Sequence, residues 1–249
     1  MSSEEIGDLT RRLQSALDQV RQLSMTDELT GLRNRRFLNA SISEDIAQVI
    51  RSYRNIQQGC ERRMPVNINI VFLMVDLDRF QAVNDTYGRL AGDRVLVQMR
   101  RLLTGNSRDT DSVIRWGGEE FLIVARNACR ADHKILAERV RKVVEDHPFD
   151  IGKDQPIRLT CSVGATVFPF LPNWPEVLGW DRVVDLADIC LSAAKRSGRN
   201  AWVGILPTDL ASLDDLTSQL GERLPDLIRE GKLDLETSLQ RKALVRWSD

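Results

Sequence analysis

A run of nearly continuous apolar residues, INIVFLMVDL at positions 68–77, limits the folds open to this chain. The run is rich in β-branched residues, which is typical of a strand buried on both faces in the middle of a sheet. Asp76 and Asp78 lie at its end, and they project to the same side because strand side chains alternate with a period of two. The sequence therefore predicts a central strand with carboxylates at its end.

Four helices and four further strands are expected around this strand. Apolar residues recur at helical spacing in the expected helices, 35–58, 92–103, 131–146 and 181–197. The further strands are expected at 112–116, 121–125, 158–168 and 201–206. Short connections and a hairpin in the middle of this order favour an α+β fold, in which a mixed, five-stranded central sheet is surrounded by helices.

The two ends of the chain differ from this region, so we expect three parts, at 1–25, 26–206 and 207–249. Polar residues surround an a/d heptad seam in the first part, formed by Ile6, Leu9, Leu13, Ala16, Val20 and Leu23. A parallel dimeric coiled coil acting as a signalling helix is the favoured interpretation, and an amphipathic helix docked on its own domain is the alternative. The last part has leucines at helical spacing and is expected to form a helical appendage.

The composition excludes several classes of protein. The formal net charge is −1, so there is no general basic excess that would favour nucleic-acid binding. No apolar run reaches the roughly 20 residues of a membrane-spanning helix, and the N-terminus has no apolar signal core. The cysteines form no C-x-x-C pair, which indicates reduced thiols in a cytoplasmic chain. His133 and His147 lie in or beside a polar helix and are expected at the surface.

The stretch RWGGEEFLIV at 115–124 predicts a β-hairpin whose turn contains Gly117, Gly118, Glu119 and Glu120. Glycines permit a strained turn and the close approach of a ligand to the backbone. If the hairpin pairs beside the central strand, the glutamates approach Asp76, and such close like charges require a compensating cation. Magnesium bound by one or two carboxylates and by substrate phosphates meets this requirement. An ordinary exposed turn with solvated acids is the alternative.

Two further stretches contain groups suited to a nucleotide. In DLDRFQAVNDTYGRLAGDRVL, Asn84 and Asp93 supply an amide and a carboxylate that are able to bind the Watson–Crick edge of guanine. In AAKRSGRN, Lys195 and Arg199 are four residues apart. On one helix end they would face the same direction and hold phosphates.

Together with the earlier stretch DELTGLRNRRF, these segments resemble the GGDEF family of diguanylate cyclases. The resemblance rests on five motifs in the family's order, DxLTGLxNR, DxDxFxxxND, GxxxGD, RWGGEEF and AKxxGRN, and covers about residues 25–206. It implies a nucleotidyl-cyclase or palm-like fold preceded by an N-terminal helix.

The resemblance also implies an activity, the joining of two GTP molecules into cyclic di-GMP with release of two pyrophosphates. Each domain of this family binds one GTP, so the activity implies a homodimer about a two-fold axis, and it is compatible with an upstream sensor domain. A catalytically silent receptor for GTP or cyclic di-GMP is the alternative, although the turn motif of such receptors is usually degraded and this one is intact. A palm acting on nucleic acid is disfavoured by the near-neutral charge.

The family's motifs imply roles for individual residues. Asp76, the Leu77 carbonyl and Glu119 are the implied ligands of Mg²⁺ or Mn²⁺. Glu120 is the implied base, or metal partner, that activates the ribose 3′-hydroxyl, and Glu119, Glu120 and Lys195 form the implied catalytic group. The implied substrate-binding residues are Phe80, Asn84, Asp93, Gly117, Gly118, Lys195 and Arg199.

A product-inhibition site is implied by the RxxD spacing of Arg108 and Asp111, with Arg139 in the following helix. Arginine forks suit the phosphates and Hoogsteen edges of a guanine dinucleotide. A surface salt bridge between Arg108 and Asp111 is the alternative. Two positions depart from the family's usual residues, because Gln81 stands in place of a lysine and Arg89 in place of a histidine.

Overall fold

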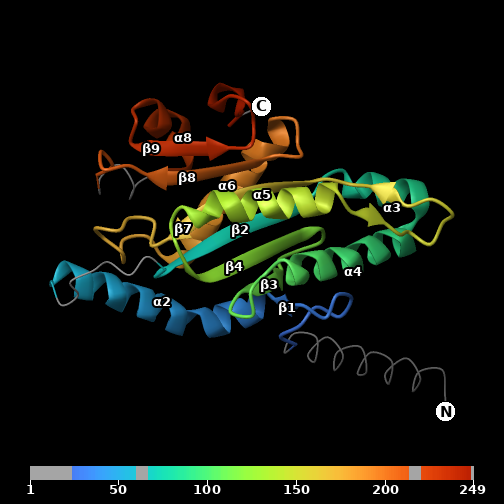
Figure 1. Cartoon of the computed structure of the whole chain (residues 1–249), viewed down its shortest axis with the longest axis horizontal. Coiled ribbons are helices and arrows are strands. Elements are labelled where there is room, and N and C mark those ends of the chain that lie inside the picture. Colours follow the sequence, from blue (N-terminus) through green and yellow to red (C-terminus); the bar gives the residue numbers. More distant parts are fainter. Residues whose placement is uncertain (1–23, 60–66, 213–219, 248–249) are drawn as a thin grey trace, which may run out of the picture.

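The computed structural model describes residues 24–59, 67–212 and 220–247. Its main sheet has seven strands in the order β1-β3-β4-β2-β7-β8-β9 (Figure 1). The strands are β1 (Arg33–Asn34), β2 (Asn69–Leu77), β3 (Ser112–Arg115), β4 (Glu120–Ala128), β7 (Cys161–Phe168), β8 (Trp202–Pro207) and β9 (Leu233–Thr237). A separate two-stranded sheet contains β5 (Pro148–Phe149) and β6 (Ile157–Arg158).

The helices lie on the two faces of the main sheet (Figure 1). They are α2 (Arg35–Gln57), α3 (Phe80–Tyr87), α4 (Arg89–Gly105), α5 (Asp132–Glu145), α6 (Trp180–Arg196) and α8 (Leu220–Arg229), with a short 3₁₀ turn, η1 (Lys242–Leu244). The predicted α+β class and mixed sheet are confirmed, since β2 is antiparallel to both β4 and β7 while β7 is parallel to β8.

The central strand β2 is buried along its whole length, as its composition predicted. Alternate residues enter two apolar cores. Phe72 and Met74 face the core built with α2, α6 and α8, and Leu73 and Val75 face the core built with α4 and α5. A strand covered on both faces has no solvent-facing positions, which is why its sequence is nearly continuous in apolar residues.

The prediction of five strands is corrected to seven by the edge strands β1 and β9. The two residues of β1 are too few to produce an alternating pattern. The expected strand at 158–168 is divided, because Ile157–Arg158 pairs with β5 and only Cys161–Phe168 joins the main sheet.

The region after residue 207 is not wholly helical. It contains α8, but it also contributes β9, which pairs antiparallel with β8 and extends the sheet (Figure 1). The heptad seam of residues 1–23 lies outside the described residues. Among the residues that are described, no helix is both long enough and apolar enough to cross a membrane.

His133 corrects the expectation that both histidines lie at the surface. Its side chain is buried at the start of α5, where Nδ1 lies 2.8 Å from the Arg130 carbonyl oxygen and Nε2 lies 3.0 Å from the Glu236 carboxylate. Burial lowers the pKa of His133, against the opposing effects of that carbonyl and of Glu236. Glu236 belongs to β9, so the polar character of α5 reflects contacts with a strand that the sequence did not predict.

Candidate functional site

The hairpin of β3 and β4 lies directly beside the end of the central strand. Asp76 in β2 is the register partner of Glu120 in β4. The backbone N–H groups of Trp116 and Gly117 both donate to the Glu120 carbonyl, at 2.9 and 3.3 Å, and close the turn. A Cβ atom at Gly117 would lie 2.9 Å from Glu120 Oε2, so the glycine leaves room for that carboxylate. The hairpin therefore brings the two glutamates to Asp76, as predicted.

Asp76 is a buried carboxylate with one cationic partner. Its side chain is 4% exposed, and Lys195 Nζ lies 2.7 Å from its Oδ2. Burial raises the pKa of Asp76 to about 6. The hydrogen bond and charge of Lys195 oppose this rise, whereas the charges of Glu119 and Glu120 add to it. Lys195 is thus the ion-pair partner of Asp76, and two further carboxylates lie close enough to act on Asp76.

This group of side chains fits a hard divalent cation. Mg²⁺ prefers oxygen ligands and is usually held by one or two protein carboxylates together with substrate phosphates. In the described parts of the chain, no cluster of three or more histidine, cysteine, aspartate or glutamate side chains could hold a metal by itself. Asp76, Glu119 and the Leu77 carbonyl offer oxygen donors of the type that an incomplete, phosphate-dependent magnesium site uses, and burial raises the pKa of Asp76 against the opposing effect of Lys195.

Phe80 and Asn84 of α3 converge on the first turn of α4. A Cβ atom at Gly92 would lie 2.0 Å from Asn84 Oδ1 and 3.1 Å from Phe80 Cζ. Only a glycine lets both side chains lie against the helix at this point. Gly88, with a φ of 85°, joins the two helices and turns α3 toward α4. Asn84 therefore lies against the helical turn that also contains Asp93, the residue after Gly92.

The expectation that Lys195 and Arg199 lie on one helix end is wrong. Helix α6 ends at Arg196, so Lys195 and Arg199 do not share one helix face. Lys195 contacts Asp76, whereas Arg199 lies in the turn after the helix with a φ of 67°. The turn nevertheless stays close to the acidic group, because the Asn200 N–H donates to Asp78 Oδ2 at 2.9 Å.

Asp78 shows why the two acids at the end of β2 differ. Its carboxylate accepts hydrogen bonds from the hydroxyls of Thr160 and Ser162, each at 2.7 Å, and from the Asn200 N–H. With these donors it needs no cation. The sequence placed Asp76 and Asp78 on one side but did not distinguish the acid that pairs with Lys195 from the one that fixes the turn.

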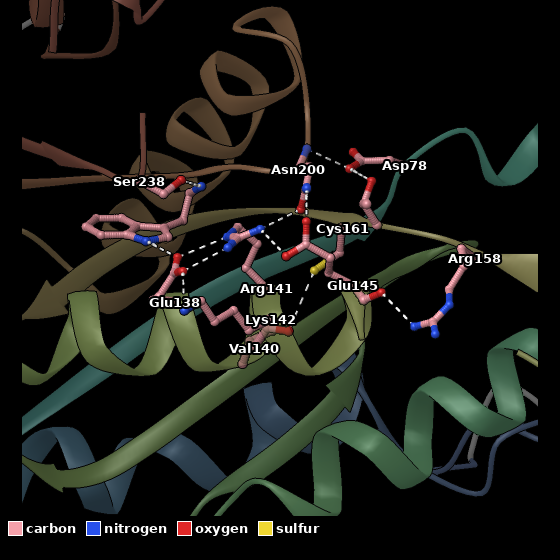
Figure 2. A network of polar contacts seen from close by, with 12 residues as sticks. Asp78, Glu138, Val140, Arg141, Lys142, Glu145, Arg158, Cys161, Asn200 and Ser238 are labelled. Carbon is pink, nitrogen blue, oxygen red and sulfur yellow. Dashed lines mark hydrogen bonds and ion pairs between the residues drawn. The ribbon is translucent and has the colours of Figure 1, made fainter. Parts of the chain in front are cut away.

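A network on α5 holds the same turn from below (Figure 2). The Asn200 side chain donates to Glu145 Oε1 at 2.6 Å and accepts from Arg141 Nη1 at 2.8 Å. Arg141 also forms ion pairs with Glu138 and Glu145, at 2.8 and 2.9 Å. Sequence reasoning missed this network, because its residues lie more than 50 positions from the turn. Charged residues on a helix are also typical of a face exposed to solvent.

Arg115 is a second residue that the sequence analysis missed. It is 9% exposed, its Nε donates to the Gly117 carbonyl at 2.7 Å, and its guanidinium lies 4.7 Å from the centre of the Phe121 ring. Burial lowers its pKa, against the charges of Asp27, Glu119 and Asp93. Arg115 therefore interacts electrostatically with Glu119 of the hairpin turn and with Asp93 of α4. Its position directly before the Trp-Gly-Gly turn was the available signal.

The candidate inhibition residues belong to other segments than the acidic group. Arg108 and Asp111 lie between α4 and β3, and Arg139 lies in α5. The Asp111 carboxylate accepts from the backbone N–H of Arg108 at 2.9 Å and of Arg126 at 3.3 Å. Within the described residues, the Arg108 guanidinium forms no ion pair with Asp111, so the salt-bridge alternative is not observed. The side chains of Arg108 and Arg139 are exposed.

The fold and the hairpin define an α+β domain with an acidic group at the end of its central strand. A family described as "Diguanylate cyclase, GGDEF domain" matches residues 24–201. The chain therefore belongs to the GGDEF family, as its motifs predicted.

Individual relatives agree with this assignment. Diguanylate cyclase DosC of Escherichia coli K12 is 34% identical over 174 residues, which are 70% of this chain and 34% of DosC. The chain thus spans about a third of the length of that relative. Diguanylate cyclase SiaD of Pseudomonas aeruginosa, solved in complex with its activator SiaC, is 33% identical with a TM-score of 0.57, covering 79% of this chain and 69% of SiaD. The active GGEEF domain of a diguanylate cyclase from Vibrio cholerae is 28% identical with a TM-score of 0.52, covering 68% of this chain and 94% of that domain.

Proposed function

We propose that this protein is a diguanylate cyclase, which condenses two GTP molecules into cyclic di-GMP and releases two pyrophosphates. The observation that supports this most directly is the group formed by Asp76, Glu119, Glu120 and Lys195 at the end of β2. The intact GGEE turn and the cyclases named among the relatives point to the same reaction.

In this proposal, Asp76, Glu119 and the Leu77 carbonyl hold Mg²⁺ or Mn²⁺. Such a cation supplies positive charge to the triphosphate and to the departing pyrophosphate. Lys195, already drawn to the site by Asp76, donates to phosphate oxygens, and Arg199 contributes a second cation from the turn. Glu120 accepts the proton of a ribose 3′-hydroxyl. The 3′-oxygen forms its bond to the α-phosphorus of the opposite GTP as the bond to the β-phosphate oxygen breaks.

We assign the binding of the guanine base to residues of α3 and α4. Asp93 accepts from N1–H and the 2-amino group of guanine, which adenine cannot offer in this arrangement, and Asn84 supplies an amide beside it. Phe80 contributes an apolar contact. Gly117 and Gly118 leave the hairpin backbone open to the nucleotide.

The reaction requires two copies of the domain, because each 3′-hydroxyl attacks a GTP bound by the other copy. We assign the pairing to residues 1–25 as a coiled coil, the chemistry to 26–206, and the remaining structure to 207–249. A homodimer about a two-fold axis satisfies this requirement. The N-terminal position of the coiled coil suits control by an upstream sensor domain.

Feedback by the product is proposed at Arg108, Asp111 and Arg139. The two arginine side chains are exposed, and Asp111 is fixed by backbone donors, so the guanidinium groups are available to a guanine dinucleotide. Arg108→Ala is expected to raise the cyclic di-GMP concentration for half-inhibition at least tenfold while the initial rate is kept. Initial rates measured against added product test this, and an unchanged inhibition constant would remove Arg108 from the site.

The proposed activity is tested by incubating the full chain with GTP and Mg²⁺ and identifying the products by mass. Cyclic di-GMP and pyrophosphate are expected. Glu120→Gln is the matched control, since it keeps the shape of the side chain but cannot accept the proton, so GTP binding should remain and product should disappear. A wild-type protein that binds GTP without forming product would instead be a silent receptor.

A further inference from the structure

The turn between α6 and β8, residues 197–201, has a backbone that requires support. Gly198, Arg199 and Asn200 all have positive φ values, of 114°, 67° and 45°. Residues other than glycine adopt this region only when their surroundings hold them there. The turn contains Arg199, so its conformation decides where that proposed phosphate-binding cation lies, and it begins directly after the last turn of α6, which carries Lys195.

One side of the turn is held by Asp78 and by the α5 network (Figure 2). These contacts all end on Asn200, in the middle of the turn. They leave open what fixes its two flanks, at the end of α6 and at the start of β8.

The first flank is fixed by residues close to the end of the described chain. The backbone N–H of Arg246 donates to Ser197 Oγ at 2.9 Å. The Arg196 guanidinium donates to the Trp247 carbonyl oxygen at 3.1 Å. These contacts tie the last turn of α6 to a segment more than 40 residues further along the chain.

The second flank is fixed by the last residue of β9, Thr237, and by Ser238, which follows it. The backbone N–H of Trp202 donates to Ser238 Oγ at 3.0 Å, and the Thr237 hydroxyl donates to the Trp202 carbonyl at 2.7 Å. Residues 233–247 therefore form hydrogen bonds on both sides of the turn. They lie outside the region that the GGDEF family matches.

The segment is anchored in the core independently of these polar contacts. Leu224 and Leu227 of α8 are fully buried, and Leu233 and Leu235 of β9 are 2% and 4% exposed. Helix α8 also approaches α6 closely, since a Cβ atom at Gly221 would lie 3.0 Å from Ile189 Cδ1. Removing one polar contact is therefore expected to loosen the turn without unfolding the segment.

We infer that residues 233–247 form a positioning element for the α6–β8 turn, with Ser197 and Ser238 as its positioning residues. The inference rests on the proposed function, because it concerns the triphosphate site of the same reaction. Cations that are already fixed bind a phosphate without the cost of ordering their backbone. The element is expected to act on GTP binding, through Lys195 and Arg199, and not on the chemical step at Glu120.

The test uses Ser197→Ala and Ser238→Ala in the full chain. Each variant should raise the KM for GTP about three- to tenfold, which is the factor that one neutral hydrogen bond contributes, with kcat within about twofold. Ser197 Oγ also donates to the Ala193 carbonyl at 2.6 Å, so Ser238→Ala, which leaves that bond intact, is the cleaner variant. Lys242→Ala is the matched control, because it removes the 2.7 Å ion pair with Asp234 in the same segment but no contact with the turn.

Amide hydrogen exchange gives a readout that does not depend on activity. Exchange at residues 199–202 should accelerate in both serine variants and stay unchanged in Lys242→Ala. If wild-type protein forms cyclic di-GMP but neither serine variant changes KM or exchange, the inference is wrong and the proposed function stands. A fall in kcat together with a rise in KM and a lowered Tm would also overturn it, because this combination indicates a general loss of structure. A wild type that neither binds GTP nor forms product overturns the proposed function, and the inference with it.

Discussion

Gly92 matters for the side chain that lies over it more than for its own backbone. An alanine there would place Cβ 2.0 Å from Asn84 Oδ1, so the amide must move. Alanine is favoured over glycine inside a helix by about 1 kcal/mol, and the added Cβ also presses on Phe80 Cζ at 3.1 Å, so the two effects oppose each other and stability should change little. The Kd for GTP should rise about tenfold, because Asn84 leaves its place against Gly92.

Calorimetric titration of Gly92→Ala with GTP measures this effect. Gly105→Ala, at the end of the same helix, is the matched control because no atom lies within 4 Å of its added Cβ. Equal GTP affinity in the two variants would mean that Asn84 does not bind the nucleotide.

Asp76 exposes a conflict between stability and function. Its pKa is raised from 3.8 to about 6, so keeping it ionised at pH 7.5 costs free energy that a neutral side chain avoids. Asp76→Asn should therefore increase the free energy of unfolding of the metal-free protein by up to about 3 kcal/mol and abolish activity.

The pH dependence of this difference follows from the sign of the shift. Well below pH 3.8 the carboxyl is protonated in both folded and unfolded chains, and the cost is absent. It grows as pH rises from 3.8 to about 6 and is constant above. Urea denaturation of both proteins at pH 5 and 7.5 should give the larger difference at pH 7.5. An Asn variant less stable than wild type at pH 7.5 would show that the Lys195 contact outweighs burial.

At the scale of single residues, the sequence predicted the contacts that follow from strand pairing. Asp76, Glu119 and Glu120 were correctly expected to converge, since a strand end and a hairpin tip meet wherever the strands pair. The roles of Asp78 and Arg115 were missed, because they depend on Asn200 and Asp93. These two residues lie in a turn and a helix, which strand pairing does not place.

At the scale of single elements, α5 combines a packing face with a polar network. Arg141 is 11% exposed and makes charged hydrogen bonds to Glu138, Glu145 and Asn200. Replacing it with leucine leaves two carboxylates without their cation, so Arg141→Leu should lower the free energy of unfolding by about 2 kcal/mol. The turn at Asn200 should loosen as well.

Chemical denaturation gives the measurement, and Lys142→Ala on the same helix is the control. Lys142 Nζ lies 3.8 Å from Glu138 and its side chain is 61% exposed. Pairs of this kind contribute little, so a loss below about 0.5 kcal/mol is expected. Equal losses in both variants would contradict a specific role for Arg141.

The elements themselves differ in how far the sequence defined them. Strand β2 was predicted because two buried faces leave an apolar run that no amphipathic helix produces. Strand β9 was missed because its five residues form a strand only where β8 offers an unpaired edge. Its neighbouring leucines at helical spacing belong in part to α8, and extending that pattern over the whole region was the error.

At the scale of the whole molecule, the proposed reaction makes activity depend on association. One domain presents one acidic group, and two must face each other before a 3′-hydroxyl reaches the opposite α-phosphorus. A coiled coil linking two chains raises the effective concentration of one domain near the other to the millimolar range, whereas separate domains meet only by collision. At low protein concentration, a chain lacking residues 1–24 should therefore have a lower specific activity than the full chain.

A single substitution tests the seam without shortening the chain. Leu13 belongs to the heptad seam and Gln14 does not, so Leu13→Asp places a charge between the helices while Gln14→Asp places it on a polar face. Leu13→Asp should reproduce the dilution-dependent loss of the shortened chain, and sedimentation should show a shift from dimer to monomer. Gln14→Asp should behave as wild type in both measurements. If Leu13→Asp stays dimeric and fully active at every dilution, residues 1–25 do not pair the domains, and the docked amphipathic helix is the correct interpretation of the seam.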